Sequence, residues 1–317
     1  MSSPAAVQSG AMPAGKPERS SRGRIRHAAA RDPIGLAALI IGVIIVLAAL
    51  LAPVLPLVSP TLIAAPPRLA PSWQHWLGTD QFGHDVLSRI VWGSRSTLAV
   101  AALSTVLAAV IGVPLGILAG YIPRWFSAGL IMRCSDVLLA FPGLMLALLV
   151  VSVLGAGNRT LVIAIGISFI PIFARFAFTS SRSVREQDYV AAARVVGCSP
   201  FRIMRSHVLP ILETEILVLV SSAIGWAVLL AATLSFLGFG VAPPAPNWGS
   251  DLAAGEDYLV QAWWISATAG AAITLVILVS TYIGDFIAGL IDPARLGQQR
   301  RRIEGATVPG EAPVTVR

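Results

Sequence analysis

Charged side chains are scarce in this sequence. Of 317 residues only 12% are charged, whereas 56% are hydrophobic, and the mean hydropathy is +0.77. A soluble domain of this size carries roughly 25% charged residues. These few polar side chains cannot cover the surface of a globular protein of this size in water. The sequence therefore excludes an ordinary soluble protein and indicates that much of the surface contacts lipid.

Cysteine, clustered histidine and nucleotide motifs are also missing. Cys134 and Cys198 have no metal-ligand spacing and make no disulfide framework, and they are best explained as small apolar filler. His75, His84 and His207 are isolated in sequence, so no metal site is expected. The chain has no Gly-x-x-x-x-Gly-Lys-Ser/Thr loop, which predicts no nucleotide site of this type and no enzymatic activity of its own.

Long apolar runs are what the sequence has in their place. A transmembrane helix needs about 20 apolar residues. Six runs qualify: Ile34–Leu57, Thr97–Tyr121, Leu130–Leu154, Thr160–Thr179, Ile216–Leu237 and Ile265–Ile291. Pro114, Pro142 and Pro171 lie inside them, which fits either bent helices around a pathway or simple packing kinks. The predicted fold is all-α, a polytopic membrane protein with six transmembrane helices.

The basic residues predict the orientation. With the N-terminus in the cytosol, 19 of the 23 Lys and Arg residues fall on the inner side, and only Arg68, Arg89, Arg95 and Arg159 fall outside. This asymmetry follows the positive-inside rule and supports an even number of spans with both termini cytosolic. The net charge of +7 is spread over many segments, so it indicates membrane topology and not nucleic-acid binding.

The domain prediction follows from these spans. Residues 1–32 and 297–317 lack apolar periodicity and are expected to be disordered cytosolic tails. A signal peptide over residues 22–57 is the less favoured alternative, because its apolar stretch is too long. Residues 33–296 form the six-helix domain, with a cytosolic loop over 180–215.

Within that loop, residues 188–210 predict two short helices. Asp188 begins the first helix, where a negative charge suits the helix dipole, and Tyr189, Ala191, Ala192 and Ala193 follow it. Gly197 is expected to end this helix in a left-handed turn. Ser199 then caps a second helix with Pro200 at its first position, and this helix should run to about His207 and stop before Pro210.

Two interpretations of this loop remain open on physical grounds. Small residues such as Ala192 and Ala193 permit close approach of a partner, so a short transverse helix could enter a groove on another protein. Alternatively, Arg194, Arg202 and Arg205 could hold the loop on lipid headgroups.

The same loop resembles the cytoplasmic loop of ABC-importer permeases, whose pattern is Glu-Ala-Ala, three residues, Gly, and later Leu-Pro. Ala192, Ala193, Gly197, Leu209 and Pro210 match it, whereas Ala191 stands where the family has Glu. Four further segments are similar to the dipeptide/oligopeptide/nickel permease family, closest to its C-type subunit. They are WLGTDQFGHDVLSRIVWGSR (76–95), SDVLLAFPGLMLAL (135–148), LSFLGFGVAPPAPNWGSDL (234–252) and GDFIAGLIDPARL (284–296).

The resemblance implies the ABC type I importer permease fold in a bacterial inner membrane. It also implies three kinds of partner: a second homologous permease subunit, two ABC ATPase subunits that hold ATP and magnesium, and an extracytoplasmic substrate-binding protein. The loop over residues 188–210 would couple the ATPases to the spans. The binding protein would meet a surface made by residues 58–96 and 238–264. Whether the cargo is a dipeptide, an oligopeptide, a nickel chelate or another solute stays open.

Charged residues inside spans are few. Asp136, Arg175 and Asp285 are costly there, and intramembrane pairing is the favoured explanation over a proton relay. A secondary transporter would need internal repeats and midplane charges, and a membrane hydrolase would need an intramembrane histidine near a serine; neither pattern is evident.

Overall fold

The computed structural model describes residues 32–122 and 126–291, and both predicted tails lie outside these residues apart from Asp32. Within them the regular structure is helical, apart from isolated β-bridges such as Ile63 with His84. The long helices are α2 (Pro33–Leu51), α3 (Val86–Tyr121), α4 (Phe126–Ala140), α5 (Gly143–Leu154), α6 (Asn158–Arg185), α9 (Leu209–Phe236) and α11 (Trp264–Ile291). The short elements are α7 (Asp188–Val195), α8 (Pro200–Ile203), the π-turn η1 (Met204–Val208), α10 (Trp248–Ala254) and the 3₁₀ turn η2 (Glu256–Tyr258).

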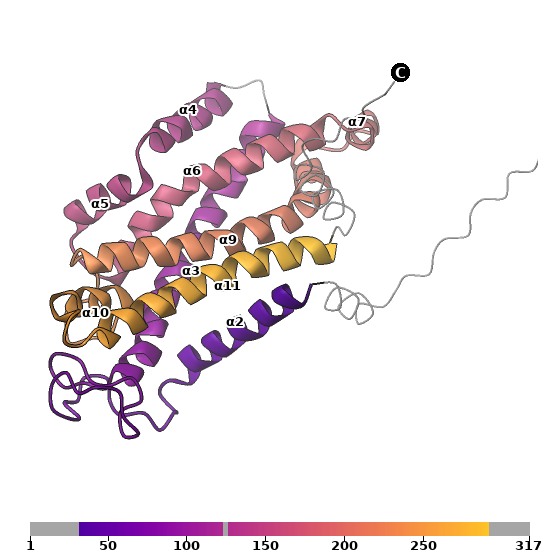
Figure 1. The fold of residues 1–317 in the computed structure, drawn as a ribbon. Helices are drawn as coiled ribbons and strands as arrows, with labels where there is room; N and C mark the ends of the chain where they lie inside the picture. Colours follow the sequence, from indigo (N-terminus) through magenta and orange to yellow (C-terminus); the bar gives the residue numbers. More distant parts are fainter. Residues whose placement is uncertain (1–31, 123–125, 292–317) are drawn as a thin grey trace, which may run out of the picture.

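The long helices form one bundle with two distinct ends (Figure 1). One end, here called the α7 end, carries α7 and α8 together with the start of α2 and the finish of α11. The opposite end, here called the α10 end, carries α10 and the long connection over residues 52–85. The two ends of the described chain therefore lie on one side, as an even number of crossings requires.

The centre of the bundle is the pair α3 and α6, which pack along much of their length. Gly112, Gly116 and Gly120 are spaced four apart and lie on one face of α3. A Cβ atom built on Gly116 would lie 2.2 Å from the carbonyl oxygen of Ala174 on α6. Small residues at this spacing let two helix backbones approach closely, as is common in membrane bundles.

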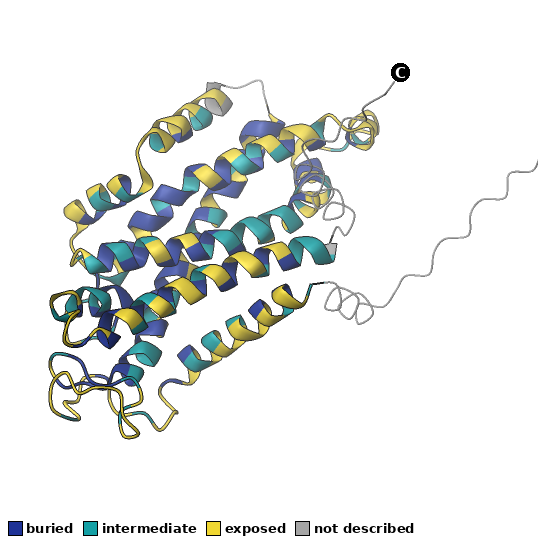
Figure 2. Cartoon of the chain, viewed as in Figure 1, coloured by how far each residue is buried: buried dark blue, intermediate teal, exposed yellow. Residues whose placement is uncertain are grey.

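The outer helices bury much less of their surface. α11 packs on α9, and α2 packs mainly on α11. Figure 2 shows α2, α4 and α5 with mostly exposed faces, and the exposed side chains of α2 include Val43, Ile44 and Leu50. An exposed apolar face on a membrane helix meets lipid or another subunit, so this exposure fits a membrane protein.

The third predicted span is broken in the structure. Among the residues that the structure describes, five helices are long and apolar enough to cross a membrane, and a sixth crossing exists only if α4 and α5 count as one span. These two helices meet at 94° at Phe141 and Pro142. The sequence predicted one helix over Leu130–Leu154, and this is corrected to two. Pro142 lacks an N–H and clashes with the preceding turn, which ends α4 and lets α5 begin in a new direction.

Other boundaries also differ from the prediction. α2 ends at Leu51, six residues early, whereas α3 begins at Val86, 11 residues before the predicted Thr97. Asp85 caps α3 by accepting a hydrogen bond from the Ser88 backbone N–H at 2.8 Å. At 36 residues, α3 is about 54 Å long and outreaches the hydrocarbon core. The hydropathy pattern detects only the apolar part of a helix, so the predicted span did not include the polar first turns of α3.

The second loop helix does not stop before Pro210. It continues through η1 into α9, with Pro210 in the first turn of α9. The Leu209 N–H reaches back five residues to the Met204 carbonyl, which widens the turn in front of the proline. A π-turn of this kind accommodates a proline ring that would otherwise clash with the carbonyl four residues earlier. Of the predicted loop over 180–215, only residues 186–208 lie outside α6 and α9.

Candidate functional sites

The α7–α8 turn has the geometry that the sequence predicts. Gly197 has φ = +87°, and the Cys198 and Gly197 N–H groups donate to the carbonyls of Ala193 and Arg194, both at 3.0 Å. These two bonds define a Schellman C-cap. Ser199 then caps α8, since its Oγ accepts a hydrogen bond from the Arg202 N–H at 3.4 Å. Gly197 is thus confirmed as the left-handed turn between the two helices.

Three sets of contacts anchor α7 to the bundle. Val190 is fully buried in the main core, beside Ile203 and Val208. The Arg194 Nε donates to the Tyr121 hydroxyl at the end of α3 at 3.2 Å, and the guanidinium lies over the Tyr121 ring. Tyr189 stacks on His207 in η1. A displacement of α7 would therefore act on α3 and on the start of α9.

The surface of this turn is apolar and exposed. Val195 and Val196 are 88% and 83% exposed, and Phe201 is 70% exposed. Ala191 and Ala192 are exposed too, whereas Ala193 is half-buried and packs against the core. The predicted contact face of Ala192 and Ala193 is therefore corrected, because Ala193 faces the chain's own interior. Asp188, Ser199, Pro200 and Pro210 are also exposed.

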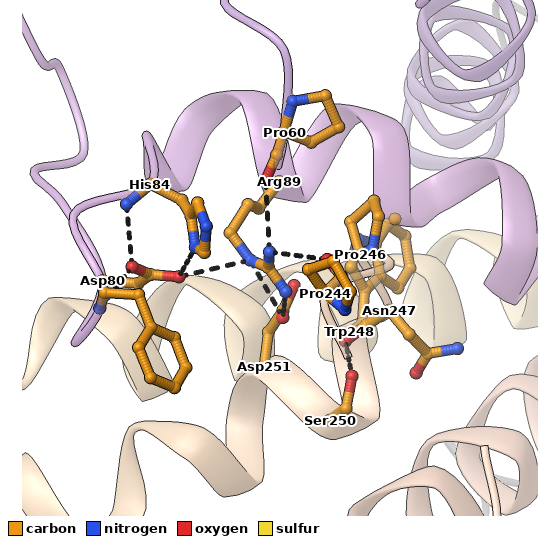
Figure 3. Close-up of polar contacts among 12 residues, drawn as sticks. Pro60, Asp80, His84, Arg89, Pro244, Pro246, Asn247, Trp248, Ser250 and Asp251 are labelled. Carbon is orange, nitrogen blue, oxygen red and sulfur yellow. Dashed lines mark hydrogen bonds and ion pairs between the residues drawn. The ribbon is translucent and has the colours of Figure 1, made fainter. Parts of the chain in front are cut away.

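The α10 end holds a buried charge network that links distant segments (Figure 3). The guanidinium of Arg89 on α3 donates from Nε and Nη2 to Asp251 Oδ1 on α10, with the Nε bond at 3.1 Å. Its Nη1 donates to the Pro60 and Pro244 carbonyls, both at 3.2 Å. The Arg89 side chain therefore connects α3, α10 and the two segments that contain Pro60 and Pro244.

Asp80 extends this network on the side of residues 52–85. Its Oδ2 lies 3.6 Å from Arg89 Nε and accepts a hydrogen bond from His84 Nδ1 at 2.7 Å. Its Oδ1 accepts from the backbone N–H groups of Phe82 and His84, both at 2.8 Å. The network borders a cavity of about 380 Å³ with apolar walls that include Ile63 and Ile265.

Burial raises the pKa of Asp251 to about 6, although the neighbouring Arg89 opposes this shift. Asp251 is only 7% exposed, and its Oδ2 has no hydrogen-bond partner among the residues that the structure describes. A buried carboxylate oxygen without a donor favours the protonated form, which accounts for the direction.

Of the three charged residues predicted inside spans, the structure brings two together. Arg175 on α6 donates from Nη1 to Asp136 Oδ1 on α4 at 2.7 Å. Asp285 is an exposed residue of α11 and is not part of this pair. Arg175 also lines an open groove of about 410 Å³.

Sequence reasoning missed several residues of these sites. It counted Arg89 only as an outer-side charge, and it took His84 as isolated. The signal was faint, because Arg89 and Asp251 lie 162 positions apart. Val195, Val196 and Phe201 could have been noticed as three large apolar residues beside a glycine turn.

Comparison with known proteins identifies the class. The family model for the inner membrane component of binding-protein-dependent transport systems matches residues 112–296, more than half of the chain. The chain belongs to this family, and it is a permease subunit of a binding-protein-dependent ABC importer.

Several curated relatives are similar over most of their length. A putative peptide transport system permease of Brucella abortus is 39% identical over 275 residues, which are 86% of this chain and 90% of the relative. A dipeptide transport system permease of Alkalihalophilus pseudofirmus is 37% identical and covers 83% and 86%. A glutathione transport system permease of Pectobacterium atrosepticum is 39% identical and covers 70% and 74%.

A solved structure has the same fold. The inward-facing MetNI methionine ABC transporter aligns with a TM-score of 0.53 over 64% of this chain and 96% of that chain, at 18% identity. The fold is therefore that of a type I ABC importer permease. The family implies ATPase and substrate-binding partners, and it is a transport component and not a nucleotide hydrolase.

Proposed function

We propose that this chain is the C-type permease subunit of an importer for short peptides. It would pair with a second, different permease and form half of the translocation pathway. Two ATPase subunits would hold ATP and magnesium beneath it, and an extracytoplasmic binding protein would deliver the cargo. The names of the relatives support the cargo class, since they carry peptides, dipeptides or glutathione.

The α7 end is proposed to face the cytosol of a bacterial inner membrane, with both termini on that side. The distribution of basic residues supports this orientation, because Arg182, Arg185, Arg194, Arg202 and Arg205 all belong to the α7 end. Residues 58–96 and 238–264 would then face the binding protein as one surface, joined through Arg89 and Asp251.

The observation that carries the coupling role is the exposed apolar turn at Gly197. The turn is held by the helix caps on both sides, and the described part of the chain does not cover its apolar side chains Val195, Val196 and Phe201. A patch of large apolar side chains on such a corner suits insertion into a groove on a partner. Because α7 contacts α3 through Arg194 and η1 through Tyr189, closure of the ATPases would move the spans.

The test uses a pair of neighbouring substitutions in the reconstituted complex. Ala192→Arg is expected to abolish substrate-stimulated ATPase activity, because a buried guanidinium without a partner costs several kcal/mol, on the order of 2–7 for a polar group alone. Ala191→Glu, at the position where the family has Glu, is expected to be tolerated. Co-purification of the ATPases is measured alongside. Full activity of Ala192→Arg would favour the alternative in which the loop lies on lipid headgroups.

The orientation has its own test in whole cells. After Cys134→Ser and Cys198→Ser, a cysteine is introduced at Val260, which is 98% exposed at the α10 end, or at exposed Ser199 at the α7 end. A membrane-impermeant thiol reagent is expected to label the Val260→Cys variant and not the Ser199→Cys variant. The opposite pattern would invert the orientation.

A further inference from the structure

The ion pair between Arg175 and Asp136 is unusually exposed for its position. The two side chains are 62% and 56% exposed, yet both belong to helices of the membrane-spanning bundle. Arg175 lies four residues before Thr179, where the predicted span ends, about 6 Å along the helix axis. Ionisable side chains within spans almost always face the protein interior or a water-filled cavity, so this pair is expected to face water or protein and not lipid.

The pair also has unused hydrogen-bonding capacity. Its single bond occupies Arg175 Nη1 and Asp136 Oδ1. Within the described residues, the remaining guanidinium N–H groups and Asp136 Oδ2 have no side-chain partner. A guanidinium offers five donors and a carboxylate about four acceptor positions, so each group can bind a further charged ligand while the pair persists.

The surroundings form a groove that suits a small solute. Arg175 lines it with apolar Leu139, Ile172 and Phe176 and with the hydroxyl side chains of Thr179 and Ser180. Asp136 lies three residues before Leu139 on α4 and pairs with Arg175, which lines the groove. The groove has a volume of about 410 Å³ and is open along one side, so a solute bound there keeps contact with the pathway.

The helix break lies close by. α4 ends at Ala140, four residues after Asp136, and α5 leaves at 94°. Non-helical backbone at membrane depth is tolerated where it borders protein or a water-filled cavity, and not where it borders lipid. The break and the exposed ion pair thus independently mark this face of α4 and α6 as turned away from lipid.

We propose that the groove between α4 and α6 is a subsite for the charged ends of a zwitterionic solute on the translocation pathway. Arg175 binds the carboxylate of a peptide with free termini, and Asp136 binds its ammonium group. The apolar wall of Ile172 and Phe176 accepts side chains without selecting among them. This inference rests on the proposed function and adds the chemical group that the pathway recognises.

The experiment measures binding to the complex without the binding protein, so that the permease alone discriminates. The complex in lipid nanodiscs is titrated with Ala-Ala, N-acetyl-Ala-Ala and Ala-Ala amide, and binding is followed by saturation-transfer NMR. The free dipeptide is expected to bind about tenfold or more tightly than either capped form, since each capped end loses a charge-assisted hydrogen bond.

Two variants test which residue binds which terminus of the peptide. Asp136→Asn is expected to bind the free and N-acetylated peptides equally, and Arg175→Gln to bind the free peptide and the amide equally. A merely structural ion pair would instead lower the affinity for all three probes by the same factor. Arg182→Gln is the matched control, since Arg182 is on the same helix, is 67% exposed and pairs with Glu186.

Three results would overturn the inference. They are equal binding of the three probes by the wild type, no measurable affinity for any probe, and loss of the second permease from the Arg175→Gln complex, which would make the pair a subunit contact. If dipeptides are still transported in these cases, the proposed function stands without this subsite. If no peptide is transported by the wild-type system with its binding protein, the proposed cargo class fails.

Discussion

The two ends of this bundle are held together by different kinds of interaction. At the α10 end, Arg89, Asp80 and Asp251 are buried and cross-link segments far apart in sequence. At the α7 end, Arg182 and Glu186 form an ion pair that is mostly exposed. There α7 is anchored by apolar packing, an arginine–tyrosine contact and an aromatic stack.

The two ends show how one permease chain can combine a rigid part with an adaptable part. A buried ion pair gives a single geometry, because breaking it leaves an uncompensated charge. An exposed apolar corner gives a surface that another protein can complete. We therefore describe the α10 end as a fixed frame and the α7 end as a joint, which under the proposed function a partner protein completes.

The strongest way to break the frame is Arg89→Ala. It leaves Asp251 and Asp80 buried without their counter-charge, and the expected loss of stability is about 3–5 kcal/mol. Limited proteolysis of residues 52–85 and thermal unfolding in detergent measure it. Arg68→Ala is the control, since Arg68 contacts Gln261 and Tyr258 at the exposed surface and should cost under about 1 kcal/mol. Equal stability of the two variants would refute the frame.

Two glycines sharpen the comparison, because both have positive φ but different surroundings. A Cβ atom on Gly83, with φ = +90°, would lie 2.2 Å from the Ala65 carbonyl oxygen, whereas Gly197 has open space. Gly83→Ala is expected to cost about 2–4 kcal/mol from strain and overpacking, and Gly197→Ala about 1–2 kcal/mol from strain alone. The same unfolding measurement ranks them, and the reverse order would contradict the packing at the α10 end.

The α10 end should also respond to pH. The pKa of Asp251 rises from 3.8 to about 6 on folding, so the folded state holds this proton more tightly between those values. The contribution of Asp251 to stability is therefore fully present below about pH 4 and is lost as pH rises through about 6, by up to about 3 kcal/mol. Amide hydrogen exchange in α10 measures this, with α7 as the internal reference. Asp251→Asn should flatten the dependence, and an unchanged slope in that variant would exclude Asp251 as its source.

The smallest effect is expected at the joint. Tyr121→Phe removes the hydroxyl that accepts from Arg194 but keeps the ring beneath the guanidinium, so about 1 kcal/mol of local stability should be lost. Faster hydrogen exchange confined to α7 is the expected result. Tyr258→Phe at the α10 end is the control, and exchange that rises equally throughout the bundle would show that Tyr121 does not hold α7 in particular.

Features of this protein that depend on local chemistry could be predicted from the order of its residues. Apolar run lengths set the membrane class and the approximate spans, because lipid cannot hydrogen-bond the backbone. The Gly197 turn and the Ser199 cap followed from residues within one helical turn of each other. The motifs in their order along the chain also indicated the family, which the comparisons show.

Features that depend on contacts between distant residues, or on the direction of a helix, became visible in the folded chain. Pro142 marks a possible break in the sequence, but the 94° angle is set by how α4 and α5 each pack on α6. The partnership of Arg89 with Asp251 joins residues 162 positions apart, and many pairings satisfy the same composition. Alanines 192 and 193 look alike in sequence, yet one faces outward and the other faces the core, because helix phase is fixed by the anchoring of Val190, Tyr189 and Arg194.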